Sequence, residues 1–147
     1  MVIVSRTYDL LGRLKALIDA DTTIMAEFTN NRVRSYYSHL PKSGSTRAIV
    51  IDILNLTGDI TTNGRYGSVD FKVDIWAKGG SDAHAKVQKI ADAVNALFTN
   101  YSANWTGSPS GQGVMLTEVM LESMGPAIEP EDSQLYGVRL VFSGLLG

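Results

Sequence analysis

One segment, from Ser68 to Ala77, constrains the fold more than any other part of this chain. Apolar and polar side chains alternate along it, which is the period of a β-strand with one buried face and one exposed face. The apolar positions are Val69, Phe71, Val73 and Ile75, and the positions between them are Asp70, Lys72, Asp74 and Trp76. Such a strand needs neighbouring strands beside it and another layer over its apolar face. The segment therefore predicts an antiparallel sheet that is covered on one side.

A helix is predicted directly after this strand. Gly79 and Gly80 end the strand, Ser81 is a suitable N-cap, and Asp82 places a negative charge in the first turn. Apolar residues then recur at spacings of three and four up to Asn100. They are Val87, Ile90, Ala91, Val94, Leu97 and Phe98. This stripe predicts a helix that packs one side against the sheet.

The same spacing predicts another amphipathic helix between Thr7 and Ala20. Its apolar stripe consists of Leu10, Leu11, Leu14, Leu17 and Ile18. After it, the segment Asp21 to Thr29 has room for one more short helical turn before two asparagines end it. The N-terminal part of the chain is therefore expected to be helical.

Four further strands are predicted from β-branched and alternating residues. They are Arg32 to Tyr37, Arg47 to Leu56, Val114 to Met124 and Leu135 to Phe142. In the second of these, the nearly continuous apolar run from Ala48 to Ile51 indicates that both faces are covered, as in a central strand. Between the elements we expect a hairpin tip, a long polar loop and an acidic loop, at Thr57 to Gly67, Tyr101 to Gly113 and Gly125 to Gln134.

The order of the elements is helix, strands, helix, strands, without a repeated strand-helix-strand crossover. This order predicts the α+β class, with an antiparallel or mixed β-sheet and two α-helices packed on one face. A chain of 147 residues with 44% hydrophobic and 19% charged residues fits a single globular domain spanning 1–147.

Composition excludes several classes of function. The chain contains no cysteine, so disulfides, thiol nucleophiles and thiolate metal sites are absent. Its net charge of −2, with acids and bases interspersed, argues against a primary nucleic-acid binder. The apolar stretches are too short for a membrane helix, and Met1 to Val4 is followed at once by polar residues, so neither membrane insertion nor secretion is expected.

Candidate metal and catalytic residues are few. The only histidines are His39, beside Pro41 in a loop, and His84, in the first turn of a predicted helix, and no ligand set at zinc spacing accompanies either. Both are interpreted as surface residues.

Paired carboxylates invite an acid–base interpretation, but their neighbours favour a structural one. Asp70 and Asp74 share one side of a strand with Lys72 between them, which predicts a solvated, salt-bridged face rather than a catalytic pair. Glu118 and Glu122 are interpreted in the same way.

Two loop motifs are weaker still. The acidic cluster Glu129, Glu131 and Asp132 lacks the alternating ligands and turn glycine of a calcium loop. The segment Gly107 to Gly113 lacks the Gly-Lys-Ser/Thr ending of a phosphate-binding loop, and no helix follows it. No catalytic, cofactor-binding or metal-binding residue is therefore predicted, and no cofactor is expected.

The remaining candidates are large apolar and aromatic side chains outside the predicted core. Aromatic residues anchor protein interfaces because they bury much area with few rotatable bonds. Trp76 lies on the polar side of its strand and Trp105 lies in a loop, so both are expected to be exposed. The predicted interface residues are Tyr66, Trp76, Trp105, Leu145 and Leu146.

Several of these segments resemble the tail terminator, or tail completion, proteins of long-tailed bacteriophages. The resemblance covers most of the chain and lies in element order. It rests on the first helix ending in Ile18-Asp19-Ala20-Asp21, the strands at Arg32-Val33 and Ile49 to Ile53, the strand from Asp70 to Trp76, and the helix from Ser81 to Phe98. Compared with the shortest members of that family, the loop Tyr101 to Gly113 is long.

The resemblance implies a non-enzymatic virion protein. Such a subunit forms a ring, expected to be a hexamer, that caps the growing tail tube, ends its polymerisation and faces the head-side connector. The implied partners are copies of itself, the tail tube protein and the connector or stopper protein, with no membrane and with DNA only passing through the lumen. The implied location is the neck of the virion, after assembly in the host cytoplasm.

Three alternatives remain open at this stage. Another ring protein of the phage neck would share the architecture and differ in its neighbours. A small-molecule-binding regulatory domain would have a pocket between helix and sheet. An enzyme would depend on Asp70 or Asp74 for its activity.

Overall fold

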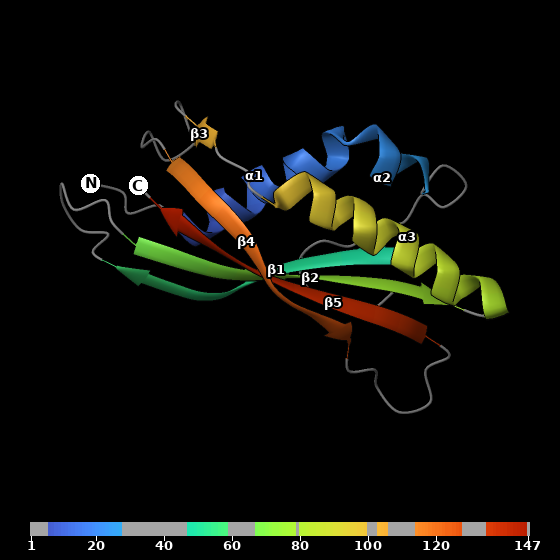
Figure 1. Ribbon diagram of the computed structural model, residues 1–147. Coiled ribbons are helices and arrows are strands. Elements are labelled where there is room, and N and C mark those ends of the chain that lie inside the picture. The colour runs from blue at the N-terminus through green and yellow to red at the C-terminus, as the bar shows by residue number, and fades with distance from the viewer. Residues whose placement is uncertain are drawn as a thin grey trace.

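The computed structural model describes residues 6–27, 47–58, 67–78, 80–99, 103–105, 114–127 and 135–146. The described helices are α1 (Arg6–Ala20), α2 (Thr22–Ala26) and α3 (Gly80–Phe98). The described strands are β1 (Arg47–Gly58), β2 (Gly67–Lys78), β3 (Ala103–Trp105), β4 (Val114–Pro126) and β5 (Leu135–Leu146). Figure 1 shows their arrangement, with the helices together above a twisted sheet.

The five strands form one sheet in the order β1-β2-β5-β4-β3. Every neighbouring pair is antiparallel. β5, the last strand along the chain, lies in the middle of the sheet between β2 and β4. The α+β class is confirmed, and the sheet is antiparallel rather than mixed in its described part.

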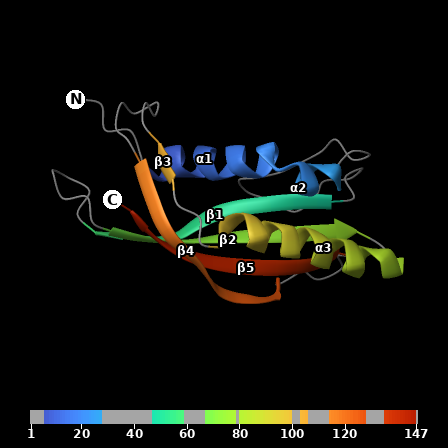
Figure 2. The ribbon, with the colours of Figure 1, turned by 45° about the horizontal axis from the view of Figure 1, so that its top comes forward.

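The helices all cover one face of the sheet, as predicted (Figure 2). α1 packs over β1, while α3 lies across β2 and β5. The short α2 is the additional helical turn expected after the first helix. The Asp21 carboxylate begins it by accepting a hydrogen bond of 2.9 Å from the Ile24 backbone N–H, as an N-cap residue does.

Three phenylalanine rings form the centre of the core between helix and sheet. Phe71 of β2 stacks on Phe142 of β5 at a centroid distance of 5.2 Å. Phe98 of α3 meets them edge-on, 5.4 Å from each. All three are fully buried, so this cluster joins the two inner strands to the long helix.

Glu27 connects the short helix to two other elements. Its backbone carbonyl accepts a hydrogen bond from the Arg47 guanidinium of β1, and its carboxylate lies 3.6 Å from the same group. The same carboxylate pairs with Lys89 of α3 at 2.9 Å. This residue therefore holds the C-terminal end of α2 against both the sheet and α3.

Two sequence predictions need correction. The segment predicted as a central strand, β1, is the edge strand of the described sheet. Its first residues are buried on both faces because Ile49 and Ile51 enter the core, while Val50 packs with Trp76 on the other side. Burial above and below a strand does not require a strand on each side of it. In addition, the predicted loop Tyr101 to Gly113 contains β3, which pairs with the start of β4.

Several other differences concern the ends of elements. β5 runs on to Leu146, beyond the predicted end at Phe142, and β4 runs on to Pro126. The predicted strand Arg32 to Tyr37 lies outside the described residues, as do the hairpin tip between β1 and β2 and most of the two longer loops. The pairing of Thr57 with Ser68 and of Gly58 with Gly67 nevertheless shows that β1 and β2 form the expected hairpin.

Candidate assembly interface

Figures 1 and 2 show that one face of the sheet is turned away from the helices, and we call it the open face. Side chains alternate between the two faces along each strand, so the residues between the core positions must point to the open face. β2 contributes Asp70, Lys72, Asp74 and Trp76, and β5 contributes Gly137, Arg139, Val141, Ser143 and Leu145.

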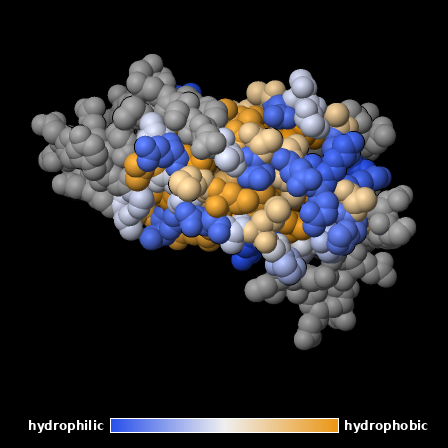
Figure 3. Space-filling model, viewed as in Figure 1, coloured by the Kyte–Doolittle hydropathy of each residue, from blue (hydrophilic) through white to orange (hydrophobic). Residues whose placement is uncertain are grey.

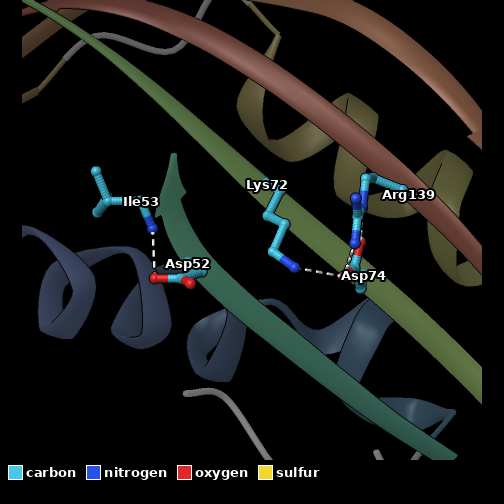
Figure 4. A network of polar contacts seen from close by, with 5 residues as sticks. All are labelled: Asp52, Ile53, Lys72, Asp74 and Arg139. Atoms are coloured by element: carbon cyan, nitrogen blue, oxygen red, sulfur yellow. Dashed lines mark hydrogen bonds and ion pairs between the residues drawn. The ribbon is translucent and has the colours of Figure 1, made fainter. Parts of the chain in front are cut away.

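A network of charges occupies the middle of the open face (Figure 4). Arg139 donates from Nε to Asp74 Oδ1 at 2.8 Å and from Nη2 to Oδ2 at 3.0 Å. Lys72 donates from Nζ to the same Oδ2 at 2.9 Å. Asp74 is only 3% exposed. Its buried charge is compensated by two cations, Lys72 and Arg139, and the guanidinium of Arg139 contacts both carboxylate oxygens. The salt-bridged character predicted for this face is confirmed, whereas Asp74 is not solvated.

The network also fixes the protonation of its arginine. The hydrogen bond to Asp74 raises the pKa of Arg139 above its already alkaline ordinary value, against the opposing effect of burial. Both carboxylate oxygens of Asp74 accept hydrogen bonds from cations. The arrangement therefore suits a structural clamp between β2 and β5 and provides no free carboxylate oxygen for proton transfer.

Trp76 is a correction to the sequence analysis, because it is buried and not exposed. It is 3% exposed and packs with Val50 and Ala127 on the open face. Its cross-strand neighbours are the small residues Ala48 and Gly137. A Cβ on Gly137 would lie 2.4 Å from the nearest atom of the indole, so the ring occupies the space that glycine leaves. Trp76 thus has little surface left for contact with a partner.

The two outer strands leave long unpaired edges in the described sheet. β3 pairs only with residues 114–116 of β4, so no described strand pairs with the outer side of residues 117–126. The outer side of β1 is likewise free of any described strand. There, the Ile53 N–H is bonded to the Asp52 carboxylate at 2.8 Å (Figure 4), as expected for an edge donor without a neighbouring strand.

Both edge strands are interrupted by bulges. The register of β1 shifts between Ile53 and Asn55, and that of β4 shifts twice, between Thr117 and Met120 and between Leu121 and Ser123. Glu118, inside the first bulge of β4, has a φ of 54°. Bulges twist an edge and re-aim its side chains, and they are common at sheet edges.

Large apolar side chains lie exposed beside these bulges. They are Leu54 at 50%, Met120 at 58%, Met124 at 45% and Leu145 at 47%. Three of them belong to the edge strands, and Leu145 lies on the open face opposite Thr117 of β4. Apolar surface also reaches the outside between hydrophilic side chains in the space-filling view (Figure 3). Exposed apolar side chains grouped on strands with free edges are typical of interaction surfaces.

The five predicted interface residues have different outcomes. Leu145 is exposed as expected, and Trp76 is not. Leu146 ends β5 and Trp105 ends β3, where it pairs with Val114, but the described residues do not include their side chains. Tyr66 lies outside the described residues.

The other candidates of the sequence analysis are not brought together into a site. His84 is exposed and stacks on Tyr136 with ring centroids 4.2 Å apart. Glu118 and Glu122 are exposed, and Glu122 accepts a hydrogen bond of 2.6 Å from the Ser143 hydroxyl. His39, the segment Gly107 to Gly113 and the cluster Glu129, Glu131 and Asp132 lie outside the described residues. Within the described ranges, no three metal-ligating side chains gather.

The described helices are all too short or too polar to span a membrane.

Sequence reasoning missed Leu54, Met120 and Met124, the exposed apolar residues of the two edge strands. Each lies in a segment predicted as a strand, and none was predicted to be an exposed interface residue. A signal exists in retrospect, since both segments break strict alternation near these residues, as a bulge requires. The sequence does not say on which edge of the sheet such a strand lies, and that position decides whether its side chains are covered.

Comparison with known proteins gives a fold but no family. No family model matches the chain, and no curated protein matches it in sequence. Among solved structures, it is similar to a chain in the virion of a native gene transfer agent (GTA) particle, with a TM-score of 0.64. The alignment covers 97% of this chain and 98% of that chain at 12% sequence identity. The two chains share a fold from end to end.

Proposed function

We propose that this chain is a structural subunit of a phage-like virion, which forms a ring that caps the tail tube, ends its polymerisation and joins it to the head-side connector. The observation that carries the proposal is the fold shared with a chain of a GTA virion over 97% of one chain and 98% of the other. The likeness therefore extends over nearly the whole of both chains and not over one shared part.

The surface of the molecule supports a role in assembly. A closed ring requires a head-to-tail contact in which two unlike patches of each subunit meet. The part of the sheet that the structure describes offers two unlike unpaired edges, at β1 and at residues 117–126 of β4, with exposed leucine and methionine side chains on them. Its best-defined polar cluster has its carboxylate saturated by cations, which suits a rigid scaffold.

The more specific role rests on the resemblance of element order to tail terminator proteins. The structure contains the first helix, the strands at Ile49 to Ile53 and Asp70 to Trp76 and the following helix as α1, β1, β2 and α3. The strand Arg32-Val33 lies outside the described residues. The proposed partners are copies of the chain, in a ring proposed to be a hexamer, then the tail tube protein and the connector or stopper protein. The proposed location is the neck of the virion.

The test is to purify the protein and examine it by electron microscopy and light scattering, alone and with tail tube protein. We expect rings of a single size that bind the end of the tube and stop its growth at substoichiometric amounts. Rings that bind only a connector protein and leave tube growth unchanged would assign the chain to another position in the neck. A strict monomer at high concentration that binds neither partner would refute the proposal.

A further inference from the structure

The two edges that no described strand pairs with run in opposite directions, and this determines how a second copy can be placed. Four long strands, β1, β2, β5 and β4, lie side by side, each antiparallel to the next. With an even number of alternating strands, the first and last edges are antiparallel to each other. A copy that is rotated but not inverted therefore brings its β1 antiparallel to β4 of its neighbour, which is the pairing already used throughout the sheet.

We propose that the outer edge of β4 in one subunit pairs with the outer edge of β1 in the next, so that a single antiparallel sheet continues around the assembly. This inference rests on the proposed ring and specifies its contact. The occupant of each edge is a second copy of this chain. We call the contact the β1–β4 seam, formed by β1 and residues 117–126 of β4.

The lengths of the two edges match in one register. If Leu54 lies opposite Met120, antiparallel counting places Thr57 opposite Thr117 at one end. At the other end, β4 reaches the first residues of β1. Gly58, the last residue of β1, then lies opposite Leu116, which already pairs with Ala103 of β3. Residues 48–57 of β1 are thus placed along residues 117–126 of β4, and only the last residue of β1 meets the edge that β3 occupies.

The same register brings together the most exposed apolar side chains of the two edges. Met120 lies opposite Ser143 and hence on the open face. Leu54 is the extra residue of the β1 bulge and directly precedes Asn55, which pairs with Asp70 of the open face. With exposures of 58% and 50%, these residues would cover each other across the seam. Both strands have a bulge beside these residues, and a bulge increases the local twist of its strand.

The size of the seam favours a ring over an isolated pair. Residues 117–126 span roughly 33 Å at about 3.3 Å per residue, and a sheet layer is about 10 Å thick, which gives roughly 330 Å² per partner. A stable complex of two proteins usually buries about 800 Å² per partner. One seam alone falls short of this value even with its apolar side chains added. In a closed ring every subunit makes two seams, so we expect assembly directly from monomer to ring, without a populated dimer.

Disulfide cross-linking tests the register directly because the chain has no cysteine of its own. Leu54→Cys and Met120→Cys, introduced together, create the only thiols. Within one subunit these positions are separated by three strand steps of about 4.8 Å, roughly 14 Å in all, whereas a disulfide needs Cα atoms within about 7 Å. Any disulfide of the double variant therefore joins two copies. Under mild oxidation we expect a ladder of covalent oligomers up to the ring size on a non-reducing gel, and its collapse to monomer on reduction.

Matched controls make each outcome informative. Leu54→Cys combined with Ala96→Cys, on the exposed side of α3, should give no ladder. A dimer band from Leu54→Cys alone would indicate symmetric β1–β1 pairing and overturn the seam. Circular dichroism of each reduced variant, identical to that of the parent, ensures that a missing ladder is not due to unfolding.

The failure of the seam and the failure of the proposed function give different results. Rings visible by electron microscopy without a Leu54–Met120 cross-link would leave the virion role intact and show that other surfaces form the contact. Absence of any assembly, together with no binding to tail tube protein, would remove both proposals.

Discussion

The two faces of the sheet are built from the same strands by different means. The face toward the helices is closed mainly by apolar packing, with the Phe71, Phe98 and Phe142 rings at its centre. The open face is held by an ion cluster around Asp74 and by one indole seated on a glycine. The first arrangement stabilises the subunit, and the second leaves apolar side chains at both edges uncovered. The helix-covered face thus holds the subunit together, and the exposed Leu54 and Met120 at the strand edges remain for the proposed contact.

The largest effect is expected on the helix-covered face. Phe71→Ala removes a fully buried ring from the aromatic cluster and should lower the free energy of unfolding by about 3–5 kcal/mol. Urea denaturation followed by circular dichroism measures this loss. Phe71→Leu, which keeps most of the volume, is the control and should cost less than about 1.5 kcal/mol. A loss for the alanine variant no larger than that of the leucine variant would contradict this account of the core.

A smaller effect is expected when the ion cluster of the open face is broken. Asp74→Asn leaves Arg139 and Lys72 without their anion and should cost roughly 3 kcal/mol, the low end for a buried pair, because Arg139 is still 34% exposed. The same denaturation experiment measures it.

The control lies on the same face of the same strand. Asp70→Asn, at a half-buried position, should change stability by less than about 0.5 kcal/mol. Equal losses of stability for Asp74→Asn and Asp70→Asn would show that the ion cluster around Asp74 contributes no more than a single half-buried carboxylate. Replacing Lys72, Asp74 and Arg139 together by apolar residues of similar size should restore much of the stability, since paired charges cost desolvation energy that an apolar set avoids.

Alanine substitutions at two glycines distinguish the effect of close packing from that of helix propensity. Gly137→Ala places a methyl group against the Trp76 indole and should cost about 1–3 kcal/mol through overpacking. Gly12→Ala, in α1, meets no atom within 4 Å and should stabilise the protein by up to about 1 kcal/mol through helix propensity. Thermal unfolding of the two variants should therefore shift in opposite directions. If both shift the same way, the indole does not lie where we describe it.

The smallest effect on the isolated subunit is expected at the edges. Met120→Ser and Leu54→Ser change exposed side chains and should alter the free energy of unfolding by less than about 0.5 kcal/mol. Assembly should nevertheless be weakened, because the apolar contact of the proposed seam is lost. Sedimentation velocity of the folded variants measures the ratio of monomer to ring. Full assembly by both variants would contradict a role of these two side chains in the proposed seam.

The sequence predicts the layers of this fold because periodicity records burial above and below a strand. The alternation around Phe71 and the helical stripe around Val94 each identify the side that faces the core, and both are observed. The order of the strands across the sheet produces no such periodic pattern in the sequence. The position of β1 at the edge depends on which strands pair, and that is decided by contacts between segments far apart in the chain.

The candidate interface was less predictable for the same reason. Trp76 was expected to be exposed because it lies on the polar side of its strand, together with Asp70, Lys72 and Asp74. Its burial depends on Ala48 and Gly137, which lie beside it only through the register of three strands. The exposure of Met120 likewise depends on β3 being too short to cover the rest of β4. The side chains that matter for assembly are set by pairing, which sequence spacing alone does not reveal.

The central position of β5 has a consequence for how the subunit is made. While the chain is being translated, β2 and β4 both emerge before the strand that lies between them, and the aromatic cluster lacks Phe142 until then. Pairing across such sequence distances is slow because a long loop must close first. The β4 edge is therefore not held in place on the ribosome until β5 has been synthesised. For the proposed β1–β4 seam, this order of synthesis means that the two edges are both in place only once the subunit is complete.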